Sequence, residues 1–557
     1  MPCAAMSAAV REVPPMAHST EYGDDSRRDP VHGEAAIALC ELFSEILEIP
    51  RVSPFMTFTE LGGDSVRAIA LTVRARASGL PIWTEDLLAD CTPERLAALA
   101  ARRSSLPSTE PMAGTAPPAA DSGRPQTLSP LQPHMLDVAG TYGAETEAVM
   151  LYVDISGDLD VPRLQAAAKQ LVQRHPNCHS GFRIASGDGR WVREVGTAVP
   201  LAWRYCDLGE QEIDEAALLR DELTSRFDLT RPPLFRIMLI KRGRARFRLV
   251  VTHSNILWDG WSTGILAAEL AMLYDAPEQP TTAVDTGTDP YDDYLRWLSR
   301  QDRRSALHAW RKVLAGIERP TVLASAAPPE SIGSTATIEL ALSESVGTDL
   351  EIRARSLGTT LSTAVQCAWG LTIAEIVGSD DIAFGYTTCG RPASVPAIDR
   401  AVGLLINDVP IRMRISDADT AASLLAQIRD QHCEMIRYEF LDSDSIQGAA
   451  GFVPLFDTLV VFQNLMRPDV YVRQDSGLRI DGYGIIESTH YALVLYGYPG
   501  DHLTFELSYH PNVFSRSFVD GLCERFRYYI EFIADDAERT IASLSSESSN
   551  SRRSHAQ

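Results

Sequence analysis

The chain has 557 residues, which at about 150 residues per domain predicts about three to four folding units and excludes a single small domain. It contains 51 Lys and Arg against 74 Asp and Glu, a net charge of −23. This acidic balance argues against nucleic acid or an anionic membrane surface as a partner. No run of about 18 apolar residues occurs, so no membrane span is expected.

The cysteine pattern indicates the redox environment of the protein, and the N-terminal segment indicates whether it carries a signal peptide. The nine cysteines form no CxxC pair, and an odd count without such pairs argues against a zinc knuckle or a disulfide framework. We therefore expect free thiols, a reducing cytoplasm and no metal site. Residues 1–30 lack a basic start followed by an apolar stretch, which predicts a disordered tail rather than a signal peptide.

A proline-rich segment divides the chain. Residues 104–126 contain five prolines and few large apolar residues, and such a composition predicts a flexible linker. It separates a small front part, residues 31–103, from a large back part, residues 127–545. Residues 546–557 form a second predicted disordered tail.

The front part has the pattern of a small helical bundle. Apolar residues recur with helical spacing in two segments, from Ala36 to Leu47 and from Val66 to Val73. The sequence Thr92-Pro93-Glu94 carries a helix start signal, with a cap, a proline in the first turn and an acid. These features predict three or four short helices.

The back part has a mixed pattern. Residues 246–250 and 458–462 are rich in β-branched and aromatic residues and predict strands, while residues 164–173 and 218–227 have helical periodicity. A mixed segment of this length implies two lobes rather than one core. We place these lobes at about 127–305 and 306–545.

Ser65 follows a Gly-Gly-Asp turn at the predicted start of a helix. Free amides and the helix dipole at such a point favour an anion, although Asp64 or Ser65 can equally be a simple helix cap. The stretch from Phe58 to Val66, within a small acidic bundle, resembles the peptidyl carrier proteins of nonribosomal peptide synthetases. The resemblance implies that Ser65 carries 4'-phosphopantetheine, attached by a phosphopantetheinyl transferase.

The back part resembles the condensation domains of the same synthetases, which are related to chloramphenicol acetyltransferase. The resemblance implies a fold class with a small four-helix carrier bundle followed by a two-lobed α/β condensation domain. Six motifs in the family's order carry it: Leu128-Ser129-Pro130-Leu131-Gln132, Arg174-His175-Pro176-Asn177, residues 290–297, Gly390-Arg391-Pro392, residues 402–407 and residues 456–462.

The central motif of that family, HHxxxDG, is altered in this chain. When Asp259-Gly260 is aligned with its end, Ser254 and Asn255 occupy the two histidine positions. In the family the second histidine faces the tunnel and positions or deprotonates the attacking amine. Asn255 can form hydrogen bonds but is not a useful base, and loss of a general base costs about 10²–10⁴ in rate. An enzyme that works mainly by positioning can survive that loss.

His253 precedes the altered motif. Residues two apart on a strand share a face and lie about 6.6 Å apart, so His253 is expected on the same side as Asn255. Two interpretations stay open, a displaced base and a histidine that only packs in the strand.

Four further residues receive roles from the resemblance. Asp259 is structural in the family and pairs with an arginine, for which Arg391 is the candidate here. Gly260 fits a close approach of the backbone. Asn407 falls near the tunnel and is either a donor to a developing oxyanion or a residue that caps a loop.

The predicted function is amide formation in nonribosomal peptide biosynthesis. Ser65 would present a thioester-bound donor, loaded by an adenylation domain in trans, to an amine on an acceptor carrier protein or to a free amine. Two alternatives remain. One is a catalytically degraded scaffold that recruits a tailoring enzyme to the loaded carrier. The other is an atypical acyltransferase that releases its product onto a free amine or alcohol.

Overall fold

The computed structural model describes most of the chain outside its two ends and the segment between its two parts. The predicted tails and the predicted linker lie outside the described residues, except for Pro30 and Ser104, which belong to helices. The described residues are 30–89, 91–104, 127–143, 147–186, 189–196, 199–208, 214–275, 289–324, 335–463, 477–487, 489, 491–500 and 502–542.

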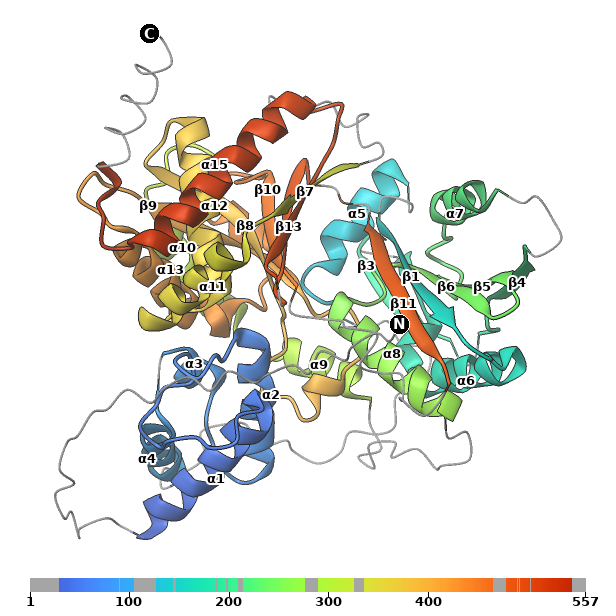
Figure 1. Ribbon diagram of the computed structural model, residues 1–557, viewed down its shortest axis with the longest axis horizontal. Helices are drawn as coiled ribbons and strands as arrows, with labels where there is room; N and C mark the ends of the chain where they lie inside the picture. The colour runs from blue at the N-terminus through green and yellow to red at the C-terminus, as the bar shows by residue number, and fades with distance from the viewer. Residues whose placement is uncertain are drawn as a thin grey trace, which may run out of the picture.

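The front part is a four-helix bundle, as predicted (Figure 1). The rings of Phe43 and Phe58 meet edge to face in its core, with centroids 5.4 Å apart. The Thr92-Pro93-Glu94 signal is confirmed, because a helix begins at Pro93. The helices are α1 (Pro30–Leu47), α2 (Ser65–Ala77), α3 (Thr84–Leu88) and α4 (Pro93–Ser104).

The buried face of α2 differs from the predicted stripe. Ala68, Leu71 and Ala75 are fully buried in the bundle core, whereas Val66 and Val73 are only partly buried. Val73 instead packs against a hydrophobic cluster of the back part. Two apolar faces on one helix therefore serve two different packing partners, which periodicity alone does not separate.

The first lobe of the back part is built on a five-stranded sheet in the order β11-β1-β6-β5-β4. Strand β6 contains the predicted strand 246–250, and the predicted helix 218–227 ends earlier, at Thr224. The elements of this lobe are α5 (Gln132–Tyr142), β1 (Ala148–Ser156), α6 (Val161–Arg174), η2 (Pro176–His179), β2 (Ser180–Ile184), β3 (Trp191–Val195), β4 (Trp203–Asp207), α7 (Glu215–Thr224), β5 (Phe235–Gly243), β6 (Arg246–Ser254), α8 (Gly260–Asp275) and β11 (Arg479–Glu487).

The second lobe has a six-stranded sheet in the order β7-β13-β12-β10-β8-β9. Its elements are α9 (Pro290–Leu298), α10 (Arg303–Leu314), β7 (Ala336–Ala341), α11 (Glu344–Ser356), α12 (Leu361–Val377), β8 (Asp381–Thr388), η4 (Ile398–Arg400), β9 (Asn407–Arg414), α13 (Ala421–Met435), η5 (Ile436–Tyr438), α14 (Ser443–Gly448), β10 (Thr458–Phe462), β12 (Leu493–Tyr498), β13 (Thr504–Tyr509) and α15 (Arg516–Asp535).

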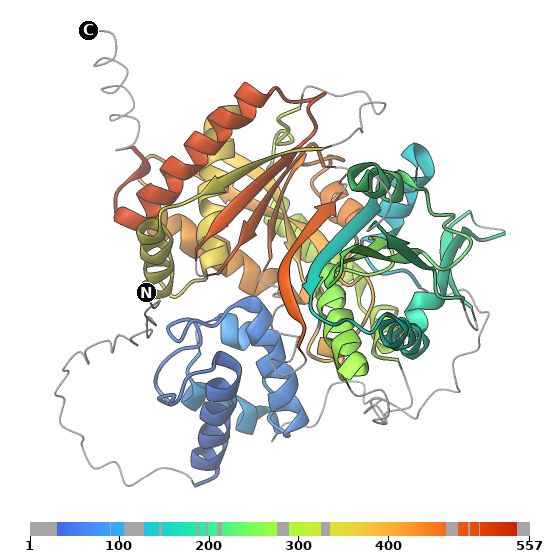
Figure 2. The same ribbon diagram turned by 45° about the vertical axis from the view of Figure 1, so that its right-hand side comes forward.

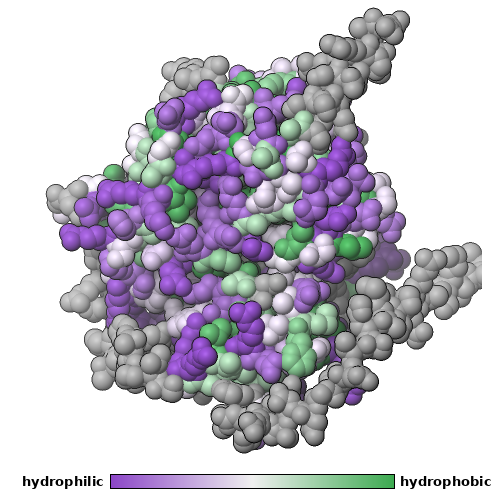
Figure 3. All heavy atoms as spheres, turned by 90° about the vertical axis from the view of Figure 1, so that its left-hand side faces the viewer, coloured by the Kyte–Doolittle hydropathy of each residue, from purple (hydrophilic) through white to green (hydrophobic). Residues whose placement is uncertain are grey.

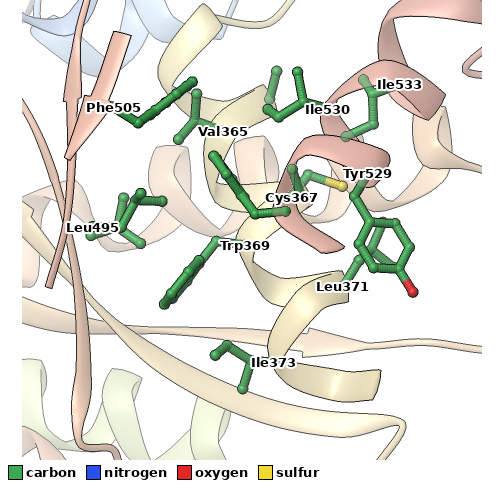
Figure 4. Close-up of a cluster of buried hydrophobic side chains, with 14 of the residues drawn as sticks. Val365, Cys367, Trp369, Leu371, Ile373, Leu495, Phe505, Tyr529, Ile530 and Ile533 are labelled. Atoms are coloured by element: carbon green, nitrogen blue, oxygen red, sulfur yellow. The ribbon is translucent and has the colours of Figure 1, made fainter. Parts of the chain in front are cut away.

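Helix α12 forms the centre of the second lobe's core. Side chains from α12, α15 and the strands β12 and β13 converge there (Figure 4). Trp369 is fully buried and meets the ring of Phe526 at a centroid distance of 6.0 Å. A helix buried on nearly all sides explains why α12 has no polar face.

The two lobes are not consecutive halves of the sequence. Strand β11 comes from the C-terminal region but pairs with β1 in the first lobe's sheet (Figure 2). Helices α9 and α10 pack in the same cluster as Phe456 of the second lobe. The predicted division at residue 305 is therefore wrong. β11, far along the chain, pairs with β1 in the first lobe, and α9, which precedes residue 305, is buried in a cluster of the second lobe.

The carrier bundle lies against the second lobe (Figures 1 and 2). Glu85 of α3 and Arg437 of η5 form an ion pair at 3.1 Å. A Cβ atom added to Gly62, just before α2, would lie 2.8 Å from the guanidinium of Arg355 on α11. Together with the packing of Val73, these contacts seat the start of α2 on the second lobe.

On the face in Figure 3, hydrophilic side chains dominate and hydrophobic ones are scattered. No single helix among the described residues has the length and apolar character needed to cross a membrane, and one pair, α11 with α12, meets that test only when joined across a 105° bend.

Candidate functional site

The backbone at the start of α2 is shaped as the sequence predicts. Gly62 has a left-handed φ of 84°, and a Cβ on Gly63 would lie 2.3 Å from the ring of Phe58. Asp64 caps the helix by accepting a hydrogen bond of 2.9 Å from the Arg67 amide. Ser65 is the first residue of a 13-residue helix whose first turn carries no acid. The helix start thus fits the phosphodiester of a phosphopantetheine group.

Asp259 and Arg391 form a buried ion pair between the two lobes. Both side chains are fully buried, and the guanidinium donates two hydrogen bonds of 3.1 Å to the two carboxylate oxygens. Such bidentate pairs fix geometry as well as charge. Arg391, which the sequence suggested as the partner of Asp259, is therefore its partner in the structure.

The carboxylate of Asp259 also collects hydrogen bonds from several amides. It accepts from the amide and hydroxyl of Ser262 at 2.9 and 2.8 Å and from the amide of Leu405 at 3.0 Å. Burial opposes ionisation, but the charge and hydrogen bonds of Arg391, helped by these amides, outweigh it and lower the pKa of Asp259. Asp259 thus fastens the loop after β6 to the 403–406 segment.

The close backbone approach occurs at Gly390 and not at Gly260. A Cβ on Gly260 would meet nothing within 4 Å, so the sequence prediction for this residue is wrong. Gly390, with a φ of 59°, would place a Cβ 1.7 Å from the carbonyl oxygen of Leu405. Any side chain at Gly390 would displace the neighbouring Arg391, because the turn leaves no room.

Ser254 and Asn255 lie at the end of β6, where the resemblance places two histidines. Ser254 is fully buried and its hydroxyl has no hydrogen-bond partner. Asn255 is partly exposed, and its backbone N–H donates to the backbone carbonyl of Glu147 at 2.7 Å. Of the two replaced positions, the second is therefore the accessible one.

His253 is part of the strand's packing. It is 2% exposed, its ring stacks on Trp258 with centroids 4.7 Å apart, and its Nδ1 lies 3.2 Å from the carbonyl of Ser254. Burial lowers its pKa to about 4. The geometry favours the interpretation of His253 as a packed strand histidine over that of a displaced base.

Asn407 caps a loop. Its Nδ2 donates hydrogen bonds of 2.7 Å to the carbonyls of Glu439 and Leu441. The amide cannot be turned around, because its oxygen would then face two carbonyl oxygens. Both amide hydrogens are thus occupied and the side chain is fully buried, so the prediction of an oxyanion donor is wrong.

The comparisons with known proteins agree with this architecture. Residues 124–554 match the family described as condensation domain, and residues 38–100 match the family described as phosphopantetheine attachment site. The chain belongs to the condensation-domain family and carries a phosphopantetheine attachment site in its front part.

The curated relatives are much longer than this chain. Chondramide synthase cmdD of Chondromyces crocatus is 31% identical over 382 residues, which are 66% of this chain and 10% of that protein. Surfactin synthase subunit 3 of Bacillus subtilis (strain 168) is 29% identical over 434 residues, which are 75% of this chain and 33% of that protein. The chain thus spans at most a third of either relative.

Solved structures share the fold. The first condensation domain of the CDA synthetase is 18% identical, with a TM-score of 0.63, and the match covers 76% of this chain and 99% of that one. The condensation domain from Monacolin K polyketide synthase MokA is 16% identical, with a TM-score of 0.64, and the match covers 75% and 99%. The two-lobed prediction for the back part is confirmed.

Replacing Arg391 tests the buried pair. Arg391→Met leaves the Asp259 carboxylate buried without its partner, and we expect the free energy of unfolding at pH 7 to fall by about 3–5 kcal/mol. In the wild type the pKa of Asp259 is lowered, so the carboxylate stabilises the fold until the pH falls through that pKa. Without Arg391, burial raises the pKa of Asp259, so the variant protonates this group as the pH falls and loses the penalty of a buried charge. The difference in the free energy of unfolding between the two proteins should therefore shrink as the pH falls from 7 to 5.

Urea unfolding at both pH values measures this effect. Arg525→Met is the matched control, since it breaks an arginine–carboxylate pair with Glu375 in which both side chains are over 40% exposed. That change should cost about 0–1 kcal/mol at either pH. An Arg391→Met protein no less stable than the Arg525→Met control would contradict the importance of the buried pair.

Proposed function

We propose that this chain forms an amide bond between a donor held as a thioester on Ser65 and an amine acceptor. The single observation that carries the proposal is the intact Asp259–Arg391 frame, which holds the accessible Asn255 at the joint between the lobes, in a chain whose carrier part is seated on the same domain. We place the carrier at residues 31–103, a flexible linker at 104–126 and the condensation domain at 127–545.

The carrier contacts support Ser65 as the donor position. Asp64, its neighbour, is close enough to Tyr386 of β8 for its charge to add to burial in raising the pKa of that phenol to about 12. Cys389 directly follows β8, and its carbonyl accepts a hydrogen bond from Arg391. The start of α2 therefore lies near the strand that leads to the Asp259–Arg391 pair.

Ser65, Asn255 and the Asp259–Arg391 pair have separate roles in the proposed reaction. When bound to Ser65, phosphopantetheine supplies the thiol that carries the donor. Asp259 and Arg391 hold the loop that presents Asn255, and the side-chain amide of Asn255 orients the attacking nitrogen, which makes positioning the main contribution. A phosphopantetheinyl transferase, an adenylation domain in trans and an acceptor carrier protein or free amine complete the reaction.

One observation favours a second candidate function. The buried hydroxyl of Ser254 lacks a hydrogen-bond partner, as expected where a replaced histidine has left its former contacts behind. A domain that had lost its chemistry would serve as a scaffold that brings a tailoring enzyme to the loaded carrier. Product analysis separates the two functions.

Ser65→Ala tests the attachment site. We expect intact-mass analysis of the wild type, after incubation with coenzyme A and a phosphopantetheinyl transferase, to show one added phosphopantetheine, and the variant to show none, because it lacks the hydroxyl that forms the ester. With a loaded donor and a panel of amines, only the wild type should yield amide. Modified Ser65→Ala protein would overturn the assignment, and a loaded wild type without amide would favour the scaffold.

Val73→Asp tests the seating of the carrier. The new carboxylate faces an apolar cluster of the second lobe, so we expect amide formation to fall about tenfold or more because docking is weakened. Attachment of phosphopantetheine should be unchanged. Ile37→Asp is the matched control, since Ile37 is 61% exposed on α1, and it should leave both measurements unchanged. Equal turnover in the two variants would show that this seating is not used in the reaction.

A further inference from the structure

An acidic residue, Glu147, is hydrogen-bonded through its backbone to Asn255. In the β1–β6 ladder Ala148 pairs with Ser254 and Val149 with His253. A 2.7 Å hydrogen bond from the backbone N–H of Asn255 to the backbone carbonyl of Glu147 follows the last of these pairs. Glu147 and Asn255 are therefore neighbours through their backbones, just beyond the end of the ladder and next to the position of the missing second histidine.

Glu147 belongs to a polar cluster formed by both lobes. It is 2% exposed. Burial lowers the pKa of His134 on α5, but the hydrogen bond and charge of Asp444 on α14, together with the charges of Glu147 and Asp408, outweigh it and raise that pKa. The same three carboxylates add to burial in raising the pKa of Tyr491. Glu147 is thus held among titratable groups from α5, β9, α14 and the segment before β12.

A second carboxyl of the back part, that of Glu439, is less suited to accept a proton. Glu439 lies beside Asn407, which donates to its carbonyl, and burial raises the pKa of its carboxyl to about 8. At neutral pH Glu439 is therefore mostly protonated. A protonated acid cannot serve as a base, and the Asp259 carboxylate is already paired with Arg391.

We propose that Glu147 accepts the proton of the attacking amine, a role for which the chain has no histidine at position 254 or 255. The proposal rests on the proposed function. The amine nitrogen forms the new C–N bond with the thioester carbonyl, and the C–S bond breaks. Glu147 takes the proton that the nitrogen loses and returns it to the departing thiolate, so that the products are an amide and a thiol. Asn255 orients the amine while this transfer occurs.

Glu147→Gln removes the base but keeps the shape of the side chain. With the loaded carrier and separately with a small soluble thioester donor, we expect kcat to fall about 10²-fold or more, with little change in the KM of the amine. Calorimetric binding of the amine acceptor should be retained, because the amide still forms hydrogen bonds.

Two further variants guard against a trivial loss of folding. Glu147→Asp keeps a carboxylate and should retain part of the activity, and Asn255→His in the Glu147→Gln background should recover activity, since it restores a base at the adjacent position. Glu531→Gln, on the exposed side of α15, is the matched control and should behave as the wild type.

The outcomes separate this inference from the proposed function. An active wild type together with a Glu147→Gln protein of unchanged kcat overturns the role of Glu147 alone. Failure of Asn255→His to restore any activity to a folded, acceptor-binding Glu147→Gln protein also overturns it. A loaded wild type that gives no amide overturns both proposals.

Discussion

The buried ion pair of Asp259 and Arg391 is the constraint on which the site depends. Asp259 follows β6 of the first lobe, and Arg391 follows β8 of the second lobe. Two charges without solvent are costly unless each satisfies the other, so the loops that carry them are held in one arrangement. Gly390 reinforces that arrangement, because its turn packs directly on the carbonyl of Leu405. The two lobes are thereby held together at the Asp259–Arg391 pair.

The carrier bundle is seated on the second lobe. Its described contacts reach α11, η4, η5 and α13, Val73 packs on an apolar cluster of that lobe, and the Glu85–Arg437 pair is at the surface. Exposed ion pairs contribute little free energy. Under the proposed function, a seating of this kind suits a carrier that delivers its donor and leaves to be loaded.

The altered motif lies where β1 and β6 end side by side. The backbone N–H of Asn255 donates to the carbonyl of Glu147, so these residues are neighbours although they are far apart in the chain. His253, two residues before Asn255, packs instead against Trp258.

Much of this protein could be predicted from its sequence. Local patterns determined the four-helix carrier, the cap at Asp64 and the start of α4, because caps, glycines and helical periodicity act within a few residues. The ordered motifs predicted the two-lobed domain and named Arg391 as the partner of Asp259. Ser254 and Asn255, which the resemblance aligns with the two histidines, lie at the end of β6 and directly after it.

Only the tertiary structure decided the features that join distant segments. The return of β11 to the first sheet, the second packing face of α2 and the position of Glu147 opposite Asn255 are set by pairing and packing between residues far apart in the chain. The roles of Asn407 and Gly260 changed for the same reason, since the carbonyls that occupy Asn407 come from the loop at 439–441 and the close approach falls at Gly390. A side chain's hydrogen-bond partners depend on what the fold places within about 3 Å of it, and no local pattern records that.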